Sequence, residues 1–219
     1  MEPYLEKINQ CALFTGINVS DLATLMDCLK AVPRTYKKNE FIFSAGETAQ
    51  SVGLVLSGNA HILQEDYWGN RTILANLESG ELFGEAFSCA ETDSLPVSVI
   101  AIDKTEVLLI DGRRLITTCA VSCGFHRVII KNMMKTLAQK NILLTQKMEM
   151  VTHRTTRERL MAYLSSQALR TKKSCFTIPF NRQQLADYLS VERSAMSAEL
   201  SKMQAAGLIR THRSAFELL

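Results

Sequence analysis

Residues 181–207 read NRQQLADYLSVERSAMSAELSKMQAAG, and this stretch has the pattern of a helix-turn-helix. Small Ala186 stands where two helices must approach closely, and residues 190–192 form a short connection between them. Gly207 can end the second helix because glycine adopts the left-handed conformation without strain. Apolar residues at helical spacing hold the second helix across the first: Leu185, Leu189, Val191, Met196 and Leu200.

The outward face of the second helix is polar. Its side chains there are Arg193, Ser194, Ser197 and Lys202. Such groups hydrogen-bond to base edges and pair with phosphates when a recognition helix lies in the major groove. A plain amphipathic helix pair shares the apolar spacing, but it does not require the small residue, the turn and the polar face together. The stretch therefore predicts a DNA-binding element.

The charge of the chain is divided between its two halves. The 219 residues carry a net charge of only +3. Residues 1–112 contain 7 Lys and Arg against 16 Asp and Glu, a net −9, whereas residues 113–219 contain 18 against 6, a net +12. A DNA-binding protein needs basic residues only where it meets the phosphates. We therefore expect the C-terminal half to face DNA and the acidic half to face away.

Residues 1–112 predict a domain built mainly of strands. The segment up to about Leu29 has apolar residues at near-helical spacing. From Val32 to Asp111, short apolar runs alternate with turns that contain glycine, which favours an antiparallel barrel or jelly roll. The runs are 40–43, 51–56, 60–63, 71–74, 97–101 and 106–110.

Residues 113–151 predict one long helix that joins two chains. A helix from about Cys123 to Met150 would be roughly 40 Å long, and its apolar seam is interrupted by Lys140 and Lys147. One small barrel cannot cover so long an apolar edge, whereas the same helix of a second chain can. The alternative is that the seam packs on its own barrel alone. The seam residues are Ile130, Met133, Leu137, Leu144 and Val151.

Residues 152–219 complete the predicted fold. We expect a hinge at 152–156, a helix at about 157–169, a short strand at 176–179 and a two-stranded wing at 208–218. The predicted fold class is thus α+β. It combines an N-terminal antiparallel β-roll or jelly roll, a long dimerisation helix and a C-terminal winged helix-turn-helix.

The composition predicts a cytoplasmic protein with no membrane partner. The chain opens on a mixed polar stretch rather than a leader, and no uncharged run approaches the length needed to span a bilayer. Six cysteines without the paired spacing of zinc sites indicate reduced thiols.

The order of these elements resembles the Crp/Fnr family of bacterial transcription regulators. The resemblance covers nearly the whole chain and is sharpest at Gly80-Glu81-Leu82-Phe83-Gly84-Glu85 and at 178–207. It implies an effector-sensing domain in 1–112, a dimerisation helix in 113–151 and a DNA-binding domain in 152–219. The implied protein is a homodimer that binds a palindromic promoter in double-stranded DNA, with a small-molecule effector and RNA polymerase as further partners.

The effector pocket departs from that of cyclic-nucleotide-binding relatives. In them, Phe-Gly-Glu opens a cassette whose backbone N–H groups hold the cyclic phosphate while the Glu takes the ribose hydroxyl. The arginine that neutralises the phosphate is replaced here by Leu95, followed by Pro96. Because a phosphate without its cation loses a charge-assisted hydrogen bond, we expect cyclic AMP not to be the effector and favour an apolar, haem-like or redox signal. The expected pocket residues are Phe83, Gly84, Glu85, Phe87, Leu95 and Met133.

The reading helix matches the family only in part. Arg193 corresponds to an arginine that relatives use on DNA, and Ser197 to a serine of the oxygen-sensing branch. Ser194 replaces a base-reading Glu, and Ala198 replaces a guanine-reading Arg, so we expect an operator different from the usual family palindrome. The predicted phosphate contacts are Arg182, Gln183, Lys202 and Arg210. Their alternative role is that of solvated surface residues.

A second candidate sensor lies at the start of the long helix. Cys119, Cys123 and His126 fall at i, i+4 and i+7, near one helical face, where they could hold a soft metal or respond to oxidants. The alternative is a set of small semi-buried cysteines with a hydrogen-bonded histidine. No iron–sulfur cluster is expected, because the relatives that hold one have clustered N-terminal cysteines and here Cys11 stands alone.

Two other functions compete with an effector-responsive regulator. One is an effector-free DNA-binding regulator whose pocket has degenerated. The other is a cupin-like metalloenzyme, but that needs several inward His or Glu ligands, and residues 32–112 contain a single His. Hydrolase and phosphate-loop motifs are also missing from the sequence, so we expect no enzyme activity.

Overall fold

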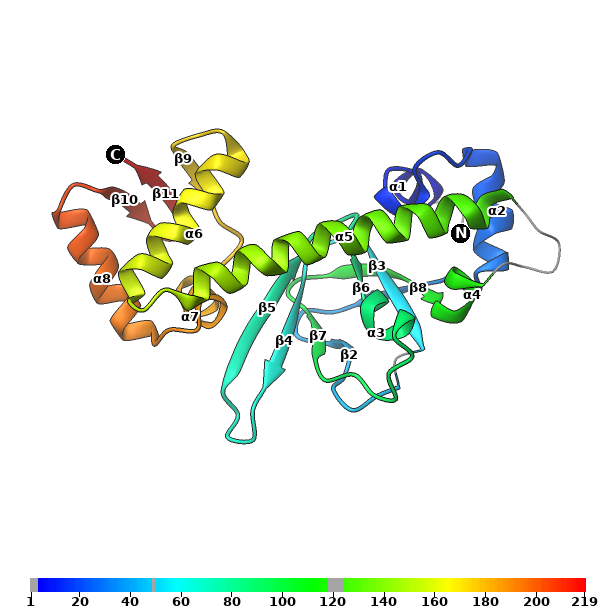
Figure 1. The fold of residues 1–219 in the computed structure, drawn as a ribbon, viewed down its shortest axis with the longest axis horizontal. Helices are drawn as coiled ribbons and strands as arrows, with labels where there is room; N and C mark the ends of the chain where they lie inside the picture. Colours follow the sequence, from blue (N-terminus) through cyan, green and yellow to red (C-terminus); the bar gives the residue numbers. More distant parts are fainter. Residues whose placement is uncertain (1–3, 49, 118–123) are drawn as a thin grey trace. The chain divides into compact units, whose positions relative to one another are not determined.

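The computed structural model describes residues 4–48, 50–117 and 124–219 (Figure 1). The chain forms two compact units, which are described separately below. The first contains Met1–Trp68 and Leu74–Asn141, and the second contains Gly69–Ile73 and Ile142–Leu219.

Two four-stranded sheets agree with the predicted β-roll, and they belong to the first unit except for residues 71–73 at the start of β5, which belong to the second. Their strand orders are β1-β8-β3-β6 and β2-β7-β4-β5. The pairings β1–β8, β3–β8, β3–β6, β2–β7 and β4–β7 are antiparallel. Apolar side chains from both sheets, Phe43, Val55 and Val99 among them, form one buried cluster. The strands are β1 (Val32–Tyr36), β2 (Phe41–Phe43), β3 (Ser51–Ser57), β4 (Ala60–Glu65), β5 (Arg71–Leu77), β6 (Leu82–Phe83), β7 (Ser98–Ala101) and β8 (Thr105–Asp111).

Helices of the first unit form a second buried cluster beside the strands. Phe14 and Leu22 from the N-terminal helices pack with Ile129 and Met133 of α5. Asn132 fastens the same contact, since its side-chain amide donates to the carbonyls of Leu13 and Thr15, both at 2.9 Å. The helices are α1 (Leu5–Asn9), the 3₁₀ turn η2 (Ala12–Phe14), α2 (Val19–Cys28), α3 (Glu85–Cys89), α4 (Gly112–Ile116) and α5 (Gly124–Thr152).

The long helix predicted by the sequence is α5, with 29 residues. At 1.5 Å per residue it is roughly 43 Å long. It contributes residues to both compact units, because the division falls between Asn141 and Ile142. Among the described residues, no helix is long and apolar enough to cross a membrane.

The second unit is a winged helix-turn-helix, as the sequence predicted. α5 ends at Thr152 and α6 begins at Thr156, so the predicted hinge is the break between two helices. Side-chain capping boxes start α6, from Thr155, and α7, from Asn181. A three-stranded sheet of order β10-β11-β9 completes the unit. Its elements are α6 (Thr156–Thr171), β9 (Cys175–Thr177), α7 (Arg182–Leu189), α8 (Arg193–Ala205), β10 (Ile209–His212) and β11 (Ala215–Leu218).

Candidate functional site

The helix-turn-helix consists of α7, a three-residue turn and α8. Ser190 ends α7 in the left-handed conformation, with φ of 53°, and Gly207 follows α8 with φ of 70°. The apolar residues predicted to join the helices are buried in one cluster, with Val191 packed at its edge. Ala186 is fully buried within it, as close approach of the two helices requires.

Arg159 of α6 hydrogen-bonds to the backbone where α7 ends and the turn begins. Its Nη1 donates to the backbone carbonyls of Leu189, at 3.2 Å, and Ser190, at 2.8 Å. Carbonyls at a helix C-terminus have no partner within their own helix, so a guanidinium there satisfies them directly. No local pattern in the sequence indicates this role of Arg159, because the contacts join positions 30 and 31 residues apart.

The N-terminus of α8 is capped by Glu192. Its carboxylate accepts from the backbone N–H of Ser194 at 2.9 Å and of Ala195 at 2.7 Å, and the Ser194 hydroxyl also donates to it. These hydrogen bonds, with Ser194 first, lower the pKa of the Glu192 carboxyl. The Ser194 hydroxyl, which the sequence predicted to contact DNA, already donates its proton to Glu192. Its oxygen can therefore only accept a further hydrogen bond.

The outer face of α8 is exposed and carries free donors. Arg193, Ser197 and Ala198 are all exposed. Within the described ranges, the Arg193 side chain makes no hydrogen bond or ion pair, so its guanidinium is available to a ligand. Lys202 lies 3.7 Å from Glu199, with its own side chain 72% exposed, and such a loose surface pair holds the lysine only weakly.

The other predicted phosphate contacts have partners inside the second unit. Arg182 donates to the Thr211 hydroxyl at 2.8 Å and its guanidinium lies 5.2 Å from the centre of the Phe216 ring. Burial lowers the pKa of Arg182. Gln183 donates to Asp187 on its own helix, at 2.8 Å. Arg210 lies 3.3 Å from Glu217 across the two wing strands. Arg182 therefore joins α7 to the wing rather than projecting freely.

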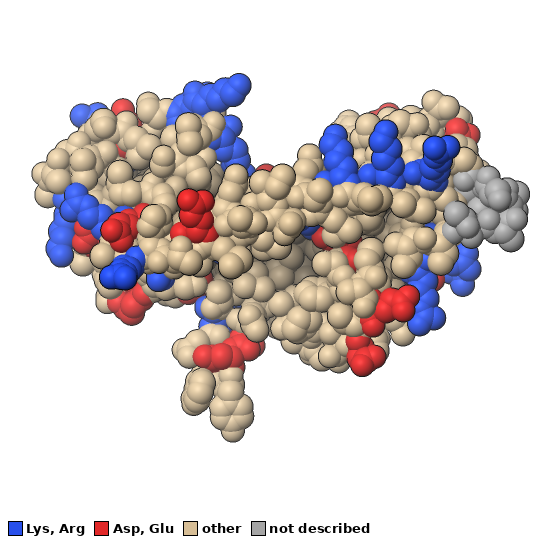
Figure 2. Space-filling model, in the orientation of Figure 1, with Lys and Arg blue, Asp and Glu red and all other residues tan. Residues whose placement is uncertain are grey.

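Basic residues are not confined to the helix-turn-helix. Residues 142–219 carry 12 Lys and Arg against 6 Asp and Glu, a net +6, while residues 113–141 carry 6 Lys and Arg and no acidic residue. Residues 113–141 therefore carry half of the net charge of +12 that residues 113–219 have. Figure 2 shows basic side chains along α5 as well as on the second unit, around α8 among other places.

The predicted effector pocket is only partly assembled by the fold. Phe83, Phe87 and Leu95 contribute to one apolar cluster of the barrel. Met133 lies in the other cluster, with the N-terminal helices, so the structure does not bring it to these residues. The Phe83 ring packs edge-on against Phe43, at 5.1 Å between centroids.

Gly84 is required by its backbone. Its φ is 79°, and a Cβ there would lie 2.9 Å from the Phe43 ring and 3.1 Å from the Ser51 carbonyl. A left-handed residue with no space for a side chain must be glycine.

Glu85 follows Gly84 as the first residue of α3 and is buried. One of its carboxylate oxygens, Oε1, lies 2.8 Å from Lys140 Nζ of α5, which also donates to the Leu82 carbonyl. Its other oxygen, Oε2, is buried without a hydrogen-bond partner among the described residues. The charge of Glu85 adds to burial in raising the pKa of the neighbouring Cys89 thiol.

A cavity of about 380 Å³ lies beside Leu95 in the barrel. It combines apolar side chains with amide, hydroxyl and carboxylate groups, and the described residues that line it include no Lys or Arg. The lining residues are Ile42, Phe43, Glu47, Thr48, Gln50, Ser51 and Leu95. A phosphate in this cavity would receive no countercharge from these side chains.

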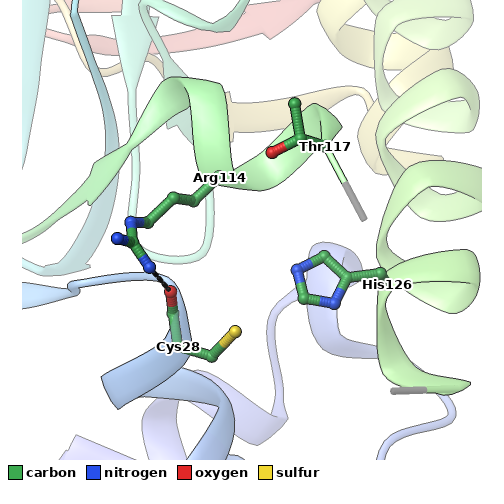
Figure 3. A pocket seen from close by; sticks show the side chains of 4 residues that line it. All are labelled: Cys28, Arg114, Thr117 and His126. Carbon is green, nitrogen blue, oxygen red and sulfur yellow. Dashed lines mark hydrogen bonds between the residues drawn. The ribbon is translucent and has the colours of Figure 1, made fainter. Parts of the chain in front are cut away.

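A second cavity, of about 230 Å³, lies between α2, α4 and α5 (Figure 3). Cys28, Arg114, Thr117 and His126 line it, and Arg114 donates to the Cys28 carbonyl at 3.0 Å. His126 is the member of the predicted metal or redox cluster that the structure places, and it is buried.

The cysteine members of that predicted cluster, Cys119 and Cys123, lie outside the described residues. In the part of the chain that the structure describes, no three His, Cys, Asp or Glu side chains are grouped as a metal site requires. Burial raises the pKa of the Cys11 thiol to about 11, which keeps it protonated and unreactive at neutral pH.

Two lysines of α5 have partners that the sequence did not predict. Lys140 and Lys147 stood out only as interruptions of the apolar seam. Lys140 pairs with Glu85, and Lys147 Nζ donates to the Ile73 carbonyl at 2.7 Å and lies 3.9 Å from the centre of the Tyr188 ring. Burial lowers the pKa of Lys147 to about 8. A charged residue within an apolar seam is the signal that marks such buried partners.

Both the N-terminal and the C-terminal part of the chain match models of known protein domains. A model of the cyclic nucleotide-binding domain matches residues 33–121, and a model of the Crp-like helix-turn-helix domain matches residues 158–219. A sensing barrel followed by a helix-turn-helix defines a class of one-chain transcription regulators. The chain belongs to the Crp/Fnr family of DNA-binding transcription regulators, whose members are not enzymes and are typically modulated by an effector.

Individual relatives are distant but extend over most of the chain. The transcriptional activator protein FnrA of Stutzerimonas stutzeri is 24% identical over 209 residues, which are 93% of this chain and 83% of the relative. The activator Anr of Pseudomonas aeruginosa is 25% identical over 89% of this chain and 79% of its own. The c-di-GMP-responsive regulator CLP of Xanthomonas campestris has a similar fold, with a TM-score of 0.76 at 21% identity over 92% of this chain and 99% of its own.

Proposed function

We propose that this regulator binds a two-fold symmetric promoter site as a homodimer, with α8 of each chain in the major groove. The observation that carries the proposal is the exposed face of α8, where the Arg193 side chain makes no hydrogen bond or ion pair with the described residues. An arginine held at the N-terminal end of a recognition helix reads guanine by two parallel hydrogen bonds. The neighbouring Ser197 and Ala198 fit smaller contacts, a hydroxyl to a base edge and a methyl group to thymine.

Phosphate contacts flank this reading face. Lys202 follows Arg193 on α8, and Arg210 lies on the wing, where each is loosely paired and more than two-thirds exposed. Ser194 and Gln183 add polar groups near the helix starts, and Arg182 positions the wing through Thr211. Contacts of this kind set affinity and register rather than sequence preference.

The dimer is supported by an apolar surface on α5. In the part of this helix within the second unit, Ile142, Leu143, Leu144 and Met148 are all more than half exposed. A soluble chain rarely leaves so many large apolar side chains in water unless a partner covers them. Pairing of two α5 helices also supplies the two-fold axis that a palindromic operator requires.

The signal is proposed to be something other than a cyclic nucleotide. Leu95 and the described residues that line the cavity beside it offer no cation to a phosphate, and Glu47 among them adds negative charge. An apolar, haem-like or redox signal and an effector-free regulator remain the alternatives for this barrel. Two relatives are named as transcriptional activators, which supports activation rather than repression. Activation would act through contact with RNA polymerase. We place this activity in the cytoplasm, where promoter DNA and reduced thiols are found.

Selection from random DNA tests the proposal, followed by anisotropy titrations on the selected site. Wild-type protein is expected to enrich an inverted repeat, and Arg193→Glu to lose specific affinity by about 100-fold or more, because a bidentate guanine contact becomes a repelled carboxylate. Lys38→Glu, the same charge change on an exposed residue of the barrel unit, is the matched control and should keep specific binding. Equal affinity of Arg193→Glu and wild type would refute the assignment of α8.

A further inference from the structure

A buried carboxylate of the barrel is paired with a lysine of the same chain. The Glu85 side chain is 4% exposed, that of Lys140 is 29% exposed, and 2.8 Å separates their charged atoms. We propose that Lys140 is a built-in ligand of the barrel: it occupies the carboxylate that an added effector would take, and it fastens α5 to α3 with no other molecule present. The inference rests on the proposed function only where DNA affinity is used to test it.

The geometry makes Lys140 a fastener between three elements of the first unit. Its ammonium bonds to the carbonyl of Leu82 in β6 and to the carboxylate of Glu85 in α3, on either side of the tight turn at Gly84. Lys140 itself lies 55 positions further along the chain, on α5. One side chain thus connects the long helix to both ends of the same turn.

The charges explain why this lysine is needed. A carboxylate withdrawn from water is stable only beside a countercharge or several donors. The sequence from 86 to 103 contains no Lys or Arg, and Leu95 within it is buried in the apolar cluster. Lys140 therefore supplies from α5 the cation that the segment after Glu85 lacks.

The pair also restricts what could replace it. Displacing Lys140 would leave the buried Glu85 carboxyl group without its countercharge, with Oε2 already lacking a hydrogen-bond partner among the described residues. A competitor must therefore bring positive charge or several hydrogen-bond donors to this carboxylate. A cyclic nucleotide that met Glu85 through its ribose would offer a hydroxyl donor but no positive charge, so nucleotides of that class should neither bind nor alter DNA affinity.

Three variants on α5 test the proposal. Lys140→Met keeps the length of the side chain and removes its charge, Lys140→Arg keeps the charge, and Lys135→Met removes an exposed charge from the same helix as a control. The readouts are hydrogen exchange of the backbone amides in 82–89, affinity for the selected DNA site, and melting with and without cyclic AMP.

The wild-type protein is expected to bind DNA equally well with and without cyclic AMP. Lys140→Met should exchange the amides of 82–89 at least about 10-fold faster and bind DNA about 10-fold more weakly, a typical coupling between two sites, while Lys140→Arg and Lys135→Met stay within about 2-fold of wild type. If Lys140→Met does not fold, the double variant Glu85→Gln/Lys140→Met replaces the buried carboxyl group with an uncharged amide. It should show the same faster amide exchange and the same weaker DNA binding.

Two results would overturn the built-in ligand. One is unchanged exchange and DNA affinity in Lys140→Met, or in the double variant if it is used. The other is a wild-type DNA affinity that depends on cyclic AMP. Failure of the wild-type protein to bind any selected DNA would instead refute the proposed function, and hydrogen exchange would still decide whether Lys140 holds the turn.

Discussion

His61 links the stability of the barrel unit to pH. It lies on β4 and its side chain is 2% exposed. Burial is the main cause that lowers its pKa from 6.5 to about 4, opposed by a hydrogen bond with Asn76. The imidazole of the folded protein is therefore neutral at pH values well above 4. Nothing in the sequence distinguished this histidine, since one His in a strand pattern carries no signal of burial.

The shift predicts acid sensitivity. Between pH 6.5 and 4, His61 is protonated in the unfolded chain but neutral in the folded protein. The free energy of unfolding therefore falls as the pH falls. The slope is at most about 1.4 kcal/mol per pH unit and the total about 3 kcal/mol. Urea unfolding of wild type and His61→Gln at several pH values measures it. Identical pH slopes for the two proteins would contradict the assignment.

Among the helices and strands, those with a clear local pattern of apolar residues, caps or turns could be predicted, and a strand without such a pattern could not. The helix-turn-helix follows from caps, a small residue and a turn that all lie within 181–207, and it was predicted in place. β1 was not predicted, because its residues do not alternate and Pro33 lacks a donor. The strand forms at the edge of its sheet through pairing with β8, from Val32↔Leu109 to Tyr36↔Thr105.

The sites show the same division. The Phe83-Gly84-Glu85 turn could be located from its residues alone, since Gly84 needs its positive φ. That Met133 packs elsewhere, and that Lys140 reaches Glu85, depends on how α5 lies against the barrel. Periodicity predicted which face of the helix is apolar, but it did not predict which partner each position meets.

The start of α7 offers a test of these local signals. Asn181 accepts from Gln184 N–H at 3.0 Å, and the Gln184 side chain accepts in turn from Asn181 N–H at 2.8 Å. Asn181→Ala should lower the free energy of unfolding by about 1 kcal/mol, because it leaves helix N–H groups without a side-chain acceptor. Asn181→Ser keeps an acceptor and should stay near wild type in chemical denaturation. Equal losses in both variants would point to a cause other than capping.

In the molecule as a whole, charge and apolar surface indicate different partners. Residues 1–112 are acidic while 113–219 are basic, and the basic residues continue along α5 as well as around α8. Exposed apolar residues gather instead on the later half of α5. DNA accounts for the basic residues around α8, and a second copy of the chain accounts for the exposed apolar residues of α5, so DNA binding and dimerisation should be coupled.

The most direct test of this account is a hydroxyl-radical footprint of the protein on its selected site. Two α8 helices related by the dimer axis should protect two segments whose centres lie about one helical turn, ~34 Å, apart, with one dimer bound per site. Arg193→Glu should leave neither segment protected at the same concentration. A single protected segment bound by one chain, or protection spread evenly along the DNA, would contradict a homodimer that reads promoter DNA through α8.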